Sequence, residues 1–138
     1  MRCVLVGNYG VGNLGDEALK EYFLCTFLDV SWTIVASKPK EAGELPRLPT
    51  GIRSFFFTQW WKTVYAIYKA DAVVFGGGSL FTDTESVLAC VLWFVHAWVA
   101  FLFGRPVMLA FQGIGPFKTS LGQRLSKMVL KRAHFVSV

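Results

Sequence analysis

The stretch Cys3-Val-Leu-Val-Gly-Asn-Tyr-Gly-Val-Gly-Asn-Leu-Gly-Asp-Glu17 decides the fold of this chain. An apolar run ends in glycine, and a glycine-rich loop leads into residues 16–28, whose apolar positions recur at helical spacing. Asp16 and Glu17 fall in the first turn of this predicted helix, where negative charge suits the helix dipole. A buried strand, a tight loop and a helix together predict the opening unit of a parallel α/β sheet.

Two further glycine motifs follow strand-like apolar runs. Gly76-Gly-Gly-Ser-Leu-Phe-Thr-Asp83 comes after residues 72–75, and Gln112-Gly-Ile-Gly-Pro-Phe117 comes after residues 107–111. In an open parallel sheet, ligands bind in the crevice beyond the carboxyl ends of the strands. All three motifs are therefore expected to open onto one edge, at a site where backbone comes close to a ligand.

The remaining segments continue the alternation of strands and helices. It predicts a doubly wound, mostly parallel α/β sheet. The last strand pattern reaches residue 138 with nothing after it, so we expect one domain, residues 1–138, truncated within its last strand and lacking a second domain. Further strands are predicted at 32–36, 52–57 and 135–138, helices at 60–69, 84–103 and 121–132, and an exposed connection at 37–51.

The composition is apolar and basic. The chain has 138 residues, of which 54% are hydrophobic and 17% charged, with a mean hydropathy of +0.46 and a net charge of +5. This apolar balance predicts a partner surface or contact with a membrane. The positive charge fits an anionic ligand, a membrane surface or nucleic acid, and a merely basic surface is an equal alternative.

Cys3, Cys25 and Cys90 are odd in number and lie in apolar segments, which predicts buried, reduced thiols in a cytoplasmic protein. There is no Cys-x-x-Cys motif, and His96 and His134 are far apart, so no structural metal is expected. His96 is interpreted as a core histidine with its hydrogen bonds satisfied.

Residues 87–103 carry no charge, a length near the lower limit for a membrane span. Parallel strands flank this run, so the helix must return to the sheet, and burial between the sheet and a partner domain is favoured over a span. Contact of Trp93, Trp98 and Phe101 with a membrane surface stays open. Residues 121–132 have an apolar face, with Leu121, Leu125, Met128 and Val129, and a basic face. The basic face is interpreted as solvated or as a contact for anionic lipid headgroups, and not as a nucleic-acid surface.

The loop Gly10-Val-Gly-Asn-Leu-Gly15 fits the dinucleotide fingerprint. The second predicted strand ends in Ala36-Ser37-Lys38, where an NAD-binding domain has an acidic residue. Lys38 suits a 2′-phosphate, so NADP is kept as an alternative. The other interpretation is a tight strand–helix turn in which Asn8 and Asn13 satisfy the loop backbone.

The triple glycine at 76–78 leaves amides that could bind an anion. Asp83 is the ionisable group at this loop and a candidate for acid–base work. Its alternative is a capping role for the next helix, since Thr82 and Glu85 fit a capping box. Gln112 is expected to point its amide into the crevice and bond a sugar hydroxyl.

Taken in order, Asn8 to Ala18, Gly76 to Asp83 and Gln112 to Pro116 resemble the polysaccharide pyruvyl transferases, and in particular the bacterial branch that acts on cell-wall polymers. The resemblance covers nearly the whole chain. It implies the N-terminal half of a two-domain, GT-B-type enzyme. The implied reaction transfers the pyruvyl group of phosphoenolpyruvate onto two hydroxyls of a saccharide, as a cyclic ketal, with release of phosphate.

The resemblance also implies a cytoplasmic protein, at or near the inner face of the membrane, with a saccharide acceptor that is lipid-linked in many such enzymes. Phosphoenolpyruvate is the donor and no cofactor is expected. The donor is expected to bind basic residues of the missing C-terminal domain, so the chain alone is predicted to be inactive. Peripheral membrane contact is expected as a further partner, and nucleic acid is not.

Asp83 is the first candidate catalytic residue and Asp16 the second. The alternatives kept open are the nucleotide- or NADP-binding half of another GT-B or Rossmann enzyme, and a partner-dependent module without catalysis. The candidate substrate-binding residues lie in the three motifs: Asn8, Gly10, Gly12, Asn13, Gly15, Glu17, Gly76, Gly77, Gly78, Ser79, Gln112, Gly113 and Gly115.

Overall fold

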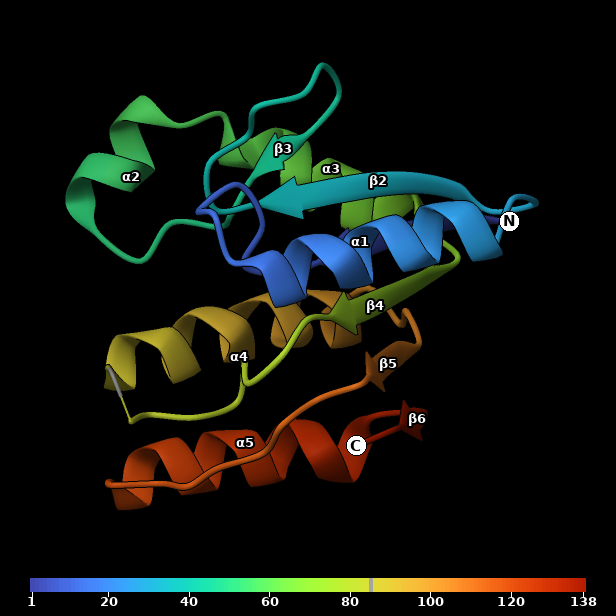
Figure 1. Ribbon diagram of the computed structural model, residues 1–138. Coiled ribbons are helices and arrows are strands. Elements are labelled where there is room, and N and C mark those ends of the chain that lie inside the picture. The colour runs from blue at the N-terminus through green and yellow to red at the C-terminus, as the bar shows by residue number, and fades with distance from the viewer. Residues whose placement is uncertain (85) are drawn as a thin grey trace.

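The computed structural model describes residues 1–84 and 86–138. The described residues form one six-stranded sheet in the order β3-β2-β1-β4-β5-β6, with every pair parallel. This confirms the predicted doubly wound, Rossmann-like α/β fold (Figure 1). The strands are β1 (Arg2–Val6), β2 (Ser31–Ala36), β3 (Leu45–Pro46), β4 (Ala72–Gly76), β5 (Val107–Ala110) and β6 (Phe135–Val136).

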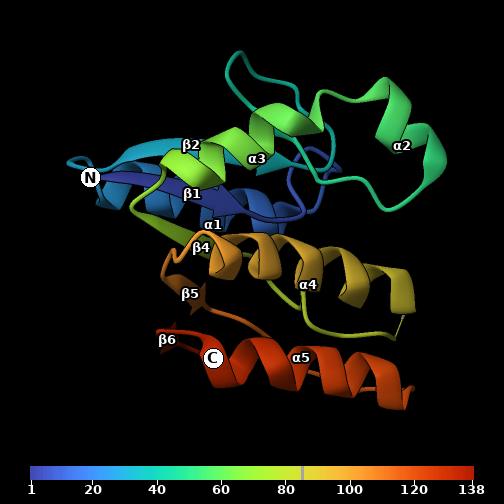
Figure 2. The same cartoon turned by 180° about the vertical axis from the view of Figure 1, so that it is seen from behind.

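Helices lie on both faces of the sheet. α1 covers one face, and α3 and α4 cover the other, with α5 beside α4 (Figures 1 and 2). α2 projects beyond the carboxyl ends of β2 and β4 in both views. The helices are α1 (Leu14–Thr26), α2 (Ile52–Phe57), α3 (Trp60–Lys69), α4 (Val87–Leu102) and α5 (Ser120–Arg132).

The central strands are buried on both faces, and alternate residues supply two cores. Val4 and Val6 of β1 pack with α3, α4 and α5, whereas Leu5 packs on the α1 side with Phe23. Side chains alternate between the two faces of a strand, and strands of a parallel sheet are covered on both. This explains why β1, β4 and β5 read as continuous apolar runs.

Two segments differ from the sequence predictions. Residues 52–57, predicted as a strand, form the helix α2, none of whose residues is buried. A strand needs a neighbour for its backbone hydrogen bonds, and this segment stands away from the sheet. The predicted exposed connection at 37–51 contains β3, which pairs with β2, and Leu48, which is buried.

The ends and faces of the later helices also differ. α4 begins at Val87 with Ser86 as its N-cap, because the Ser86 hydroxyl accepts a hydrogen bond from the Leu88 amide at 3.1 Å. The predicted capping box includes Glu85, which lies outside the described residues. α5 buries Gly122, Ser126 and Val129, whereas Leu121 and Met128 of the predicted apolar face are exposed.

The apolar α4 buries one side against the sheet, with six of its sixteen residues buried. Trp93 is buried and so is not available to a membrane surface, and the Arg132 guanidinium of α5 lies 4.9 Å from the Trp98 ring centroid. Within the described residues, no helix is both long and apolar enough to cross a membrane. Cys3 and Cys90 are buried free thiols as predicted, but Cys25 is exposed.

Candidate functional site

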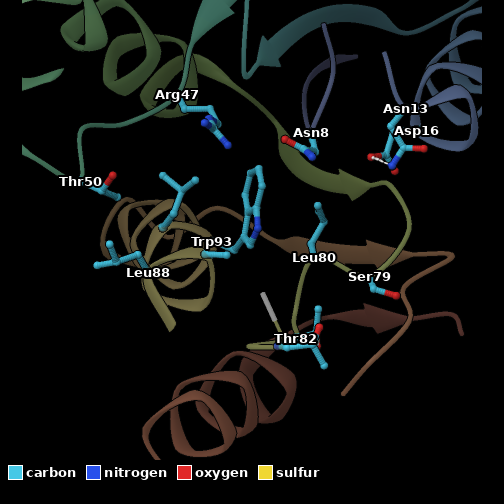
Figure 3. A pocket seen from close by; sticks show the side chains of 13 residues that line it. Asn8, Asn13, Asp16, Arg47, Thr50, Ser79, Leu80, Thr82, Leu88 and Trp93 are labelled. Atoms are coloured by element: carbon cyan, nitrogen blue, oxygen red, sulfur yellow. Dashed lines mark hydrogen bonds between the residues drawn. The ribbon is translucent and has the colours of Figure 1, made fainter. Parts of the chain in front are cut away.

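A cleft of about 570 Å³ lies at the carboxyl ends of β1 and β4. The chain leaves β1 toward β2 and leaves β4 toward β5, so the strand order reverses between these neighbours. Such a switch point is where open α/β sheets bind ligands. The lining side chains are mostly polar, and Figure 3 shows how they converge. They are Asn8, Asn13, Asp16, Arg47, Thr50, Ser79, Leu80, Thr82, Thr84, Leu88, Ala89, Leu92 and Trp93.

The loop after β1 forms one wall of the cleft. Two of its positions favour glycine, each for a different physical reason. Gly10 has a φ of 81°, and an added Cβ would overlap the Lys38 carbonyl oxygen. Gly12 has a φ of 85° but open space around it, so only its backbone conformation favours glycine. The buried Tyr9 hydroxyl donates to the Gly76 carbonyl and so joins this loop to the end of β4.

Asp16 connects the first two glycine motifs. Its carboxylate accepts hydrogen bonds from the Gly78 amide at 2.8 Å and from the Asn13 side-chain amide at 2.9 Å. Asp16 is only 4% exposed yet lines the cleft. Burial raises the pKa of its carboxyl, against the opposing effect of the Gly78 hydrogen bond. A buried carboxyl with a raised pKa at a cleft wall is suited to proton transfer.

Both asparagines of the first motif line the cleft, but only Asn13 bonds the loop backbone, as one interpretation of the sequence expected for both. Asn13 is the N-cap of α1, and its side-chain oxygen accepts from the Gly15 amide at 3.2 Å. The Ser37 hydroxyl donates to the Asn8 side-chain oxygen at 2.6 Å. Each amide group is therefore held in a fixed orientation at the cleft.

Arg47 and Trp93 form the opposite wall. The Arg47 guanidinium lies 5.6 Å from the Trp93 ring centroid, and the two side chains point toward each other in Figure 3. Burial lowers the pKa of Arg47. Even so, a guanidinium remains charged at neutral pH. Among the described residues, it is the one cation that lines this cleft.

His96 fixes this wall from beneath. Its Nε2 accepts from the Leu48 amide at 3.0 Å, and its Nδ1 lies 2.8 Å from the Leu92 carbonyl, to which it donates. Burial lowers the pKa of His96 to about 4, so the ring is neutral at physiological pH. This confirms His96 as a core histidine with satisfied hydrogen bonds. Its bond to the Leu48 amide also fixes the backbone next to Arg47.

Asp83 has a different place from the one expected. Its carboxylate accepts from the Lys118 amide at 2.6 Å, the Thr119 amide at 2.8 Å and the Thr119 hydroxyl. These bonds hold the pKa of Asp83 below its ordinary value, the Thr119 hydroxyl bond having the largest effect. Asp83 is outside the cleft lining and fixes the start of α5, not of α4. This arrangement is poorly suited to donating a proton.

The third motif meets the second, but its glutamine is turned inward. The Gly113 amide donates to the Gly78 carbonyl at 3.1 Å. Gln112 is buried, and its side-chain nitrogen donates to the carbonyls of Phe75 at 3.1 Å and Gly77 at 2.6 Å. Its expected position in the crevice is therefore not observed: the amide joins β4 to the loop after β5.

One amide in each of the first two glycine loops has a carboxylate partner and is not free to hold an anion. Gly78 donates to Asp16, and Gly10 donates to Glu17 at 2.6 Å. This bond lowers the pKa of Glu17, whose carboxylate also forms an ion pair with the buried Lys20 at 3.1 Å. The arrangement favours the interpretation of this loop as a tight strand–helix turn over the dinucleotide fingerprint, whose amides must face a pyrophosphate.

The structure therefore divides the predicted site residues into two groups. Asn8, Asn13, Asp16 and Ser79 line the cleft. The others shape its walls from behind or lie outside it: Gly10, Gly12, Gly15, Glu17, Gly76, Gly77, Gly78, Asp83, Gln112, Gly113 and Gly115.

Sequence reasoning missed nine of the thirteen lining residues, among them Arg47, Thr50 and Trp93. Arg47 and Thr50 fall in the segment interpreted as an exposed connection. The segment Pro46-Arg-Leu-Pro49 was the sequence signal for Arg47, because prolines on both sides restrict the backbone around this lone cation.

Together, the fold and the cleft define an α/β protein with a polar, partly aromatic cleft at the switch point of a parallel sheet. The family model described as "Polysaccharide pyruvyl transferase" matches residues 13–138. The chain therefore belongs to the polysaccharide pyruvyl transferase family, whose members are transferases. This confirms the resemblance found in the three sequence motifs.

None of the curated proteins compared with the chain matches it. A solved structure titled "Trypanosoma brucei CTPS - glutaminase domain with bound acivicin" aligns with 96% of this chain, at 16% identity and a TM-score of 0.42. This chain spans 40% of the length of that one. A similarity of this size carries no argument about function.

Proposed function

We propose that this chain forms the acceptor-binding part of an enzyme that moves the pyruvyl group of phosphoenolpyruvate onto a saccharide as a cyclic ketal. The observation that carries the proposal is the cleft, which a member of this family places at the switch point of its sheet. Its lining offers amides, hydroxyls and an indole ring, the groups with which proteins bind sugar hydroxyls and ring faces.

The reaction sets the chemical requirements of the site. A proton adds to the methylene carbon of phosphoenolpyruvate, two acceptor hydroxyls form bonds to the neighbouring carbon, and phosphate leaves with the bonding electrons. The two hydroxyl protons must be taken up by a base or by the departing phosphate. The site therefore needs a proton-transferring group and cations for the donor carboxylate and phosphate.

Asp16 is our candidate for proton transfer. It is the carboxyl in the cleft wall whose pKa burial raises, which lets it hold a proton closer to neutral pH than an exposed aspartate. Asn8, Asn13 and Ser79 are proposed to orient the acceptor hydroxyls. This assignment reverses the order suggested by the sequence, in which Asp83 came first.

Arg47 is proposed to face the anionic part of a substrate, and Trp93 to lie beside a sugar ring. The guanidinium and the indole are close enough to act as one surface, with a charge next to a flat apolar face. Since one cation is few for a donor with a carboxylate and a phosphate, we propose that further basic residues come from a second domain in a GT-B-type arrangement.

The assay follows phosphate release from phosphoenolpyruvate with a panel of disaccharides as acceptors. Mass spectrometry of the acceptor identifies the ketal. It is run on the 138-residue chain alone and on the chain with a second domain supplied. We expect phosphate release and ketal formation only in the second case, and loss of both in Arg47→Gln, with Arg124→Gln on α5 as the surface control.

Three results would count against parts of the proposal. Ketal formation by the chain alone would contradict the need for a second domain but support the reaction. Full activity of Arg47→Gln would remove Arg47 from the site. Absence of phosphate release in every form, together with binding of NADP in titration, would replace the proposal with the dinucleotide alternative.

A further inference from the structure

The helix α2 (Ile52–Phe57) exposes apolar side chains in a way that a packed helix does not. None of its residues is buried, and Phe56 and Phe57 are 74% and 86% exposed. A surface helix of a globular protein normally turns its apolar face to a core. We call the exposed side chains of Ile52, Phe55, Phe56 and Phe57 the α2 patch.

The α2 patch stands on a fixed base. On its N-terminal side, the Leu48 amide donates to His96, and the Thr63 hydroxyl donates to the Pro46 carbonyl at 2.5 Å. On its C-terminal side, the Trp60 indole nitrogen donates to the Phe55 carbonyl at 2.9 Å. The chain is therefore anchored by hydrogen bonds on both sides of these side chains, which extend toward solvent.

The charges around the patch have one sign. Every charged residue between positions 45 and 70 is cationic, and Arg53 and Lys62 are exposed on α2 and α3. The Lys62 ammonium lies 5.5 Å from the ring centroid of Trp61, which is itself exposed. Bulky apolar and aromatic side chains next to Lys and Arg are typical of helices that lie in the surface of a lipid bilayer.

The area of the patch fits a bilayer better than a second copy of the chain. At about 150–250 Å² for a whole aromatic side chain, the four side chains expose on the order of 600 Å². A stable interface between proteins needs about 800 Å² on each partner. In a bilayer, binding strength grows with the apolar area that is buried, and each Lys or Arg near anionic lipid adds to it.

We propose that the α2 patch, with Arg53 and Lys62, is a docking surface for an anionic lipid bilayer. Phe56 and Phe57 enter the boundary between headgroups and acyl chains, and the two cations pair with anionic headgroups. The proposal does not depend on the reaction. It has a consequence for the cleft, because Thr50 lines the cleft and Gly51 is the N-cap of α2, so docking places the cleft opening beside the lipid.

The test is cosedimentation of the 138-residue chain with vesicles of phosphatidylcholine, with or without phosphatidylglycerol. We expect binding to the mixed vesicles that weakens as salt is raised. F56S/F57S is expected to lower the partition coefficient about tenfold or more. R53Q/K62Q is expected to lower it about tenfold on mixed vesicles and to leave the weak binding to phosphatidylcholine unchanged.

Two matched controls separate the patch from general hydrophobicity and general charge. L28S/L102S removes two exposed leucines outside the patch, and R124Q/K127Q removes two exposed cations of α5. Both should bind as the wild type does, and circular dichroism should show that all four variants are folded. The proposal is overturned if the wild type does not bind mixed vesicles or if F56S/F57S still binds. It is also overturned if R124Q/K127Q loses as much binding as R53Q/K62Q, or if F56S/F57S instead abolishes a concentration-dependent dimer.

Discussion

Asp16 and Asp83 are both nearly buried, at 4% and 3% exposure, and both belong to glycine motifs after central strands. Asp16 accepts two hydrogen bonds, one from a backbone amide, and burial raises the pKa of its carboxyl. Asp83 accepts three hydrogen bonds, two from backbone amides, and its pKa is lowered. Burial has the largest effect on the pKa of Asp16, whereas hydrogen bonding has the largest effect on the pKa of Asp83, and this balance decides the direction of each shift.

The comparison teaches which aspartate is available for chemistry. The carboxylate of Asp83 is fully engaged in holding the start of α5, outside the cleft. Asp16 is in the cleft wall and retains acceptor capacity. Proximity to a glycine loop does not distinguish these roles, because the distinction depends on which amides the rest of the fold brings to each carboxylate.

The largest effect is expected for Asp83→Ala. The change leaves the Lys118 and Thr119 amides without their acceptor and removes the anchor of α5. Thermal unfolding monitored by circular dichroism should show a midpoint lower by roughly 10 °C. Asp71→Asn is the control, since exposed Asp71 also accepts a backbone hydrogen bond, from Arg2. Equal midpoints for the two variants would show that Asp83 is not a structural anchor.

Asp16→Asn should act mainly on activity. Asparagine keeps an acceptor for the Gly78 amide but cannot transfer a proton, so ketal formation should fall about a hundredfold or more. Glu21→Gln, an exposed change on the same helix, should be neutral. An active Asp16→Asn enzyme would leave the cleft without its proposed proton-transfer group.

The same variant tests the sign of the Asp16 pKa shift. A carboxyl whose folded-state pKa is raised above its unfolded value of about 3.8 stabilises the fold below that pH, and this contribution is lost as pH rises. Asp16→Asn should therefore gain stability relative to the wild type as pH increases above about 4. Urea denaturation across this range measures the difference in stability. A relative loss of stability in Asp16→Asn with rising pH would mean that the pKa of Asp16 is lowered in the fold.

His96 adds a neutral buried group to the two aspartates. Its pKa is about 4 in the fold against 6.5 in the unfolded chain, so the unfolded state binds more protons between these values. Acidification from pH 6.5 to 4 should remove roughly 3 kcal/mol of stability through this residue. His96→Gln should show a correspondingly shallower pH dependence in urea denaturation. An unchanged slope would mean that His96 is not buried in its neutral form.

The smallest effects are expected for alanine substitutions at Gly15 and Gly122. These glycines lie in the first turns of α1 and α5, near Asp16 and Asp83. An added Cβ at Gly122 would lie 2.6 Å from the Asp83 carboxylate, whereas at Gly15 it would meet only Asn13, at 3.6 Å. Gly122→Ala should cost about 1–3 kcal/mol through this clash. Gly15→Ala should stabilise by up to about 1 kcal/mol through helix propensity. Chemical denaturation compares them, and stabilisation by both changes would show that Asp83 is not packed against α5.

Much of the fold could be predicted because its signals are local. The apolar runs of β1, β4 and β5 and the helical spacing of α3 and α5 were assigned within one or two residues. The segment at 52–57 was assigned wrongly because a short run of Ile and Phe is compatible with either a buried strand or an exposed helix. Only a neighbouring strand, absent at that position, could have decided between them.

The sequence by itself determined the α/β class, the three glycine loops at one edge of the sheet and membership in a transferase family, because strand ends and turn residues are read from short windows. Tertiary structure alone decided which polar groups reach the cleft. It brought Arg47 to Trp93, turned Gln112 into the core and gave Asp83, but not Asp16, a full set of backbone donors. The physical reason is that desolvation and hydrogen bonding depend on partners far away in the chain, and these partners are fixed only when the layers pack.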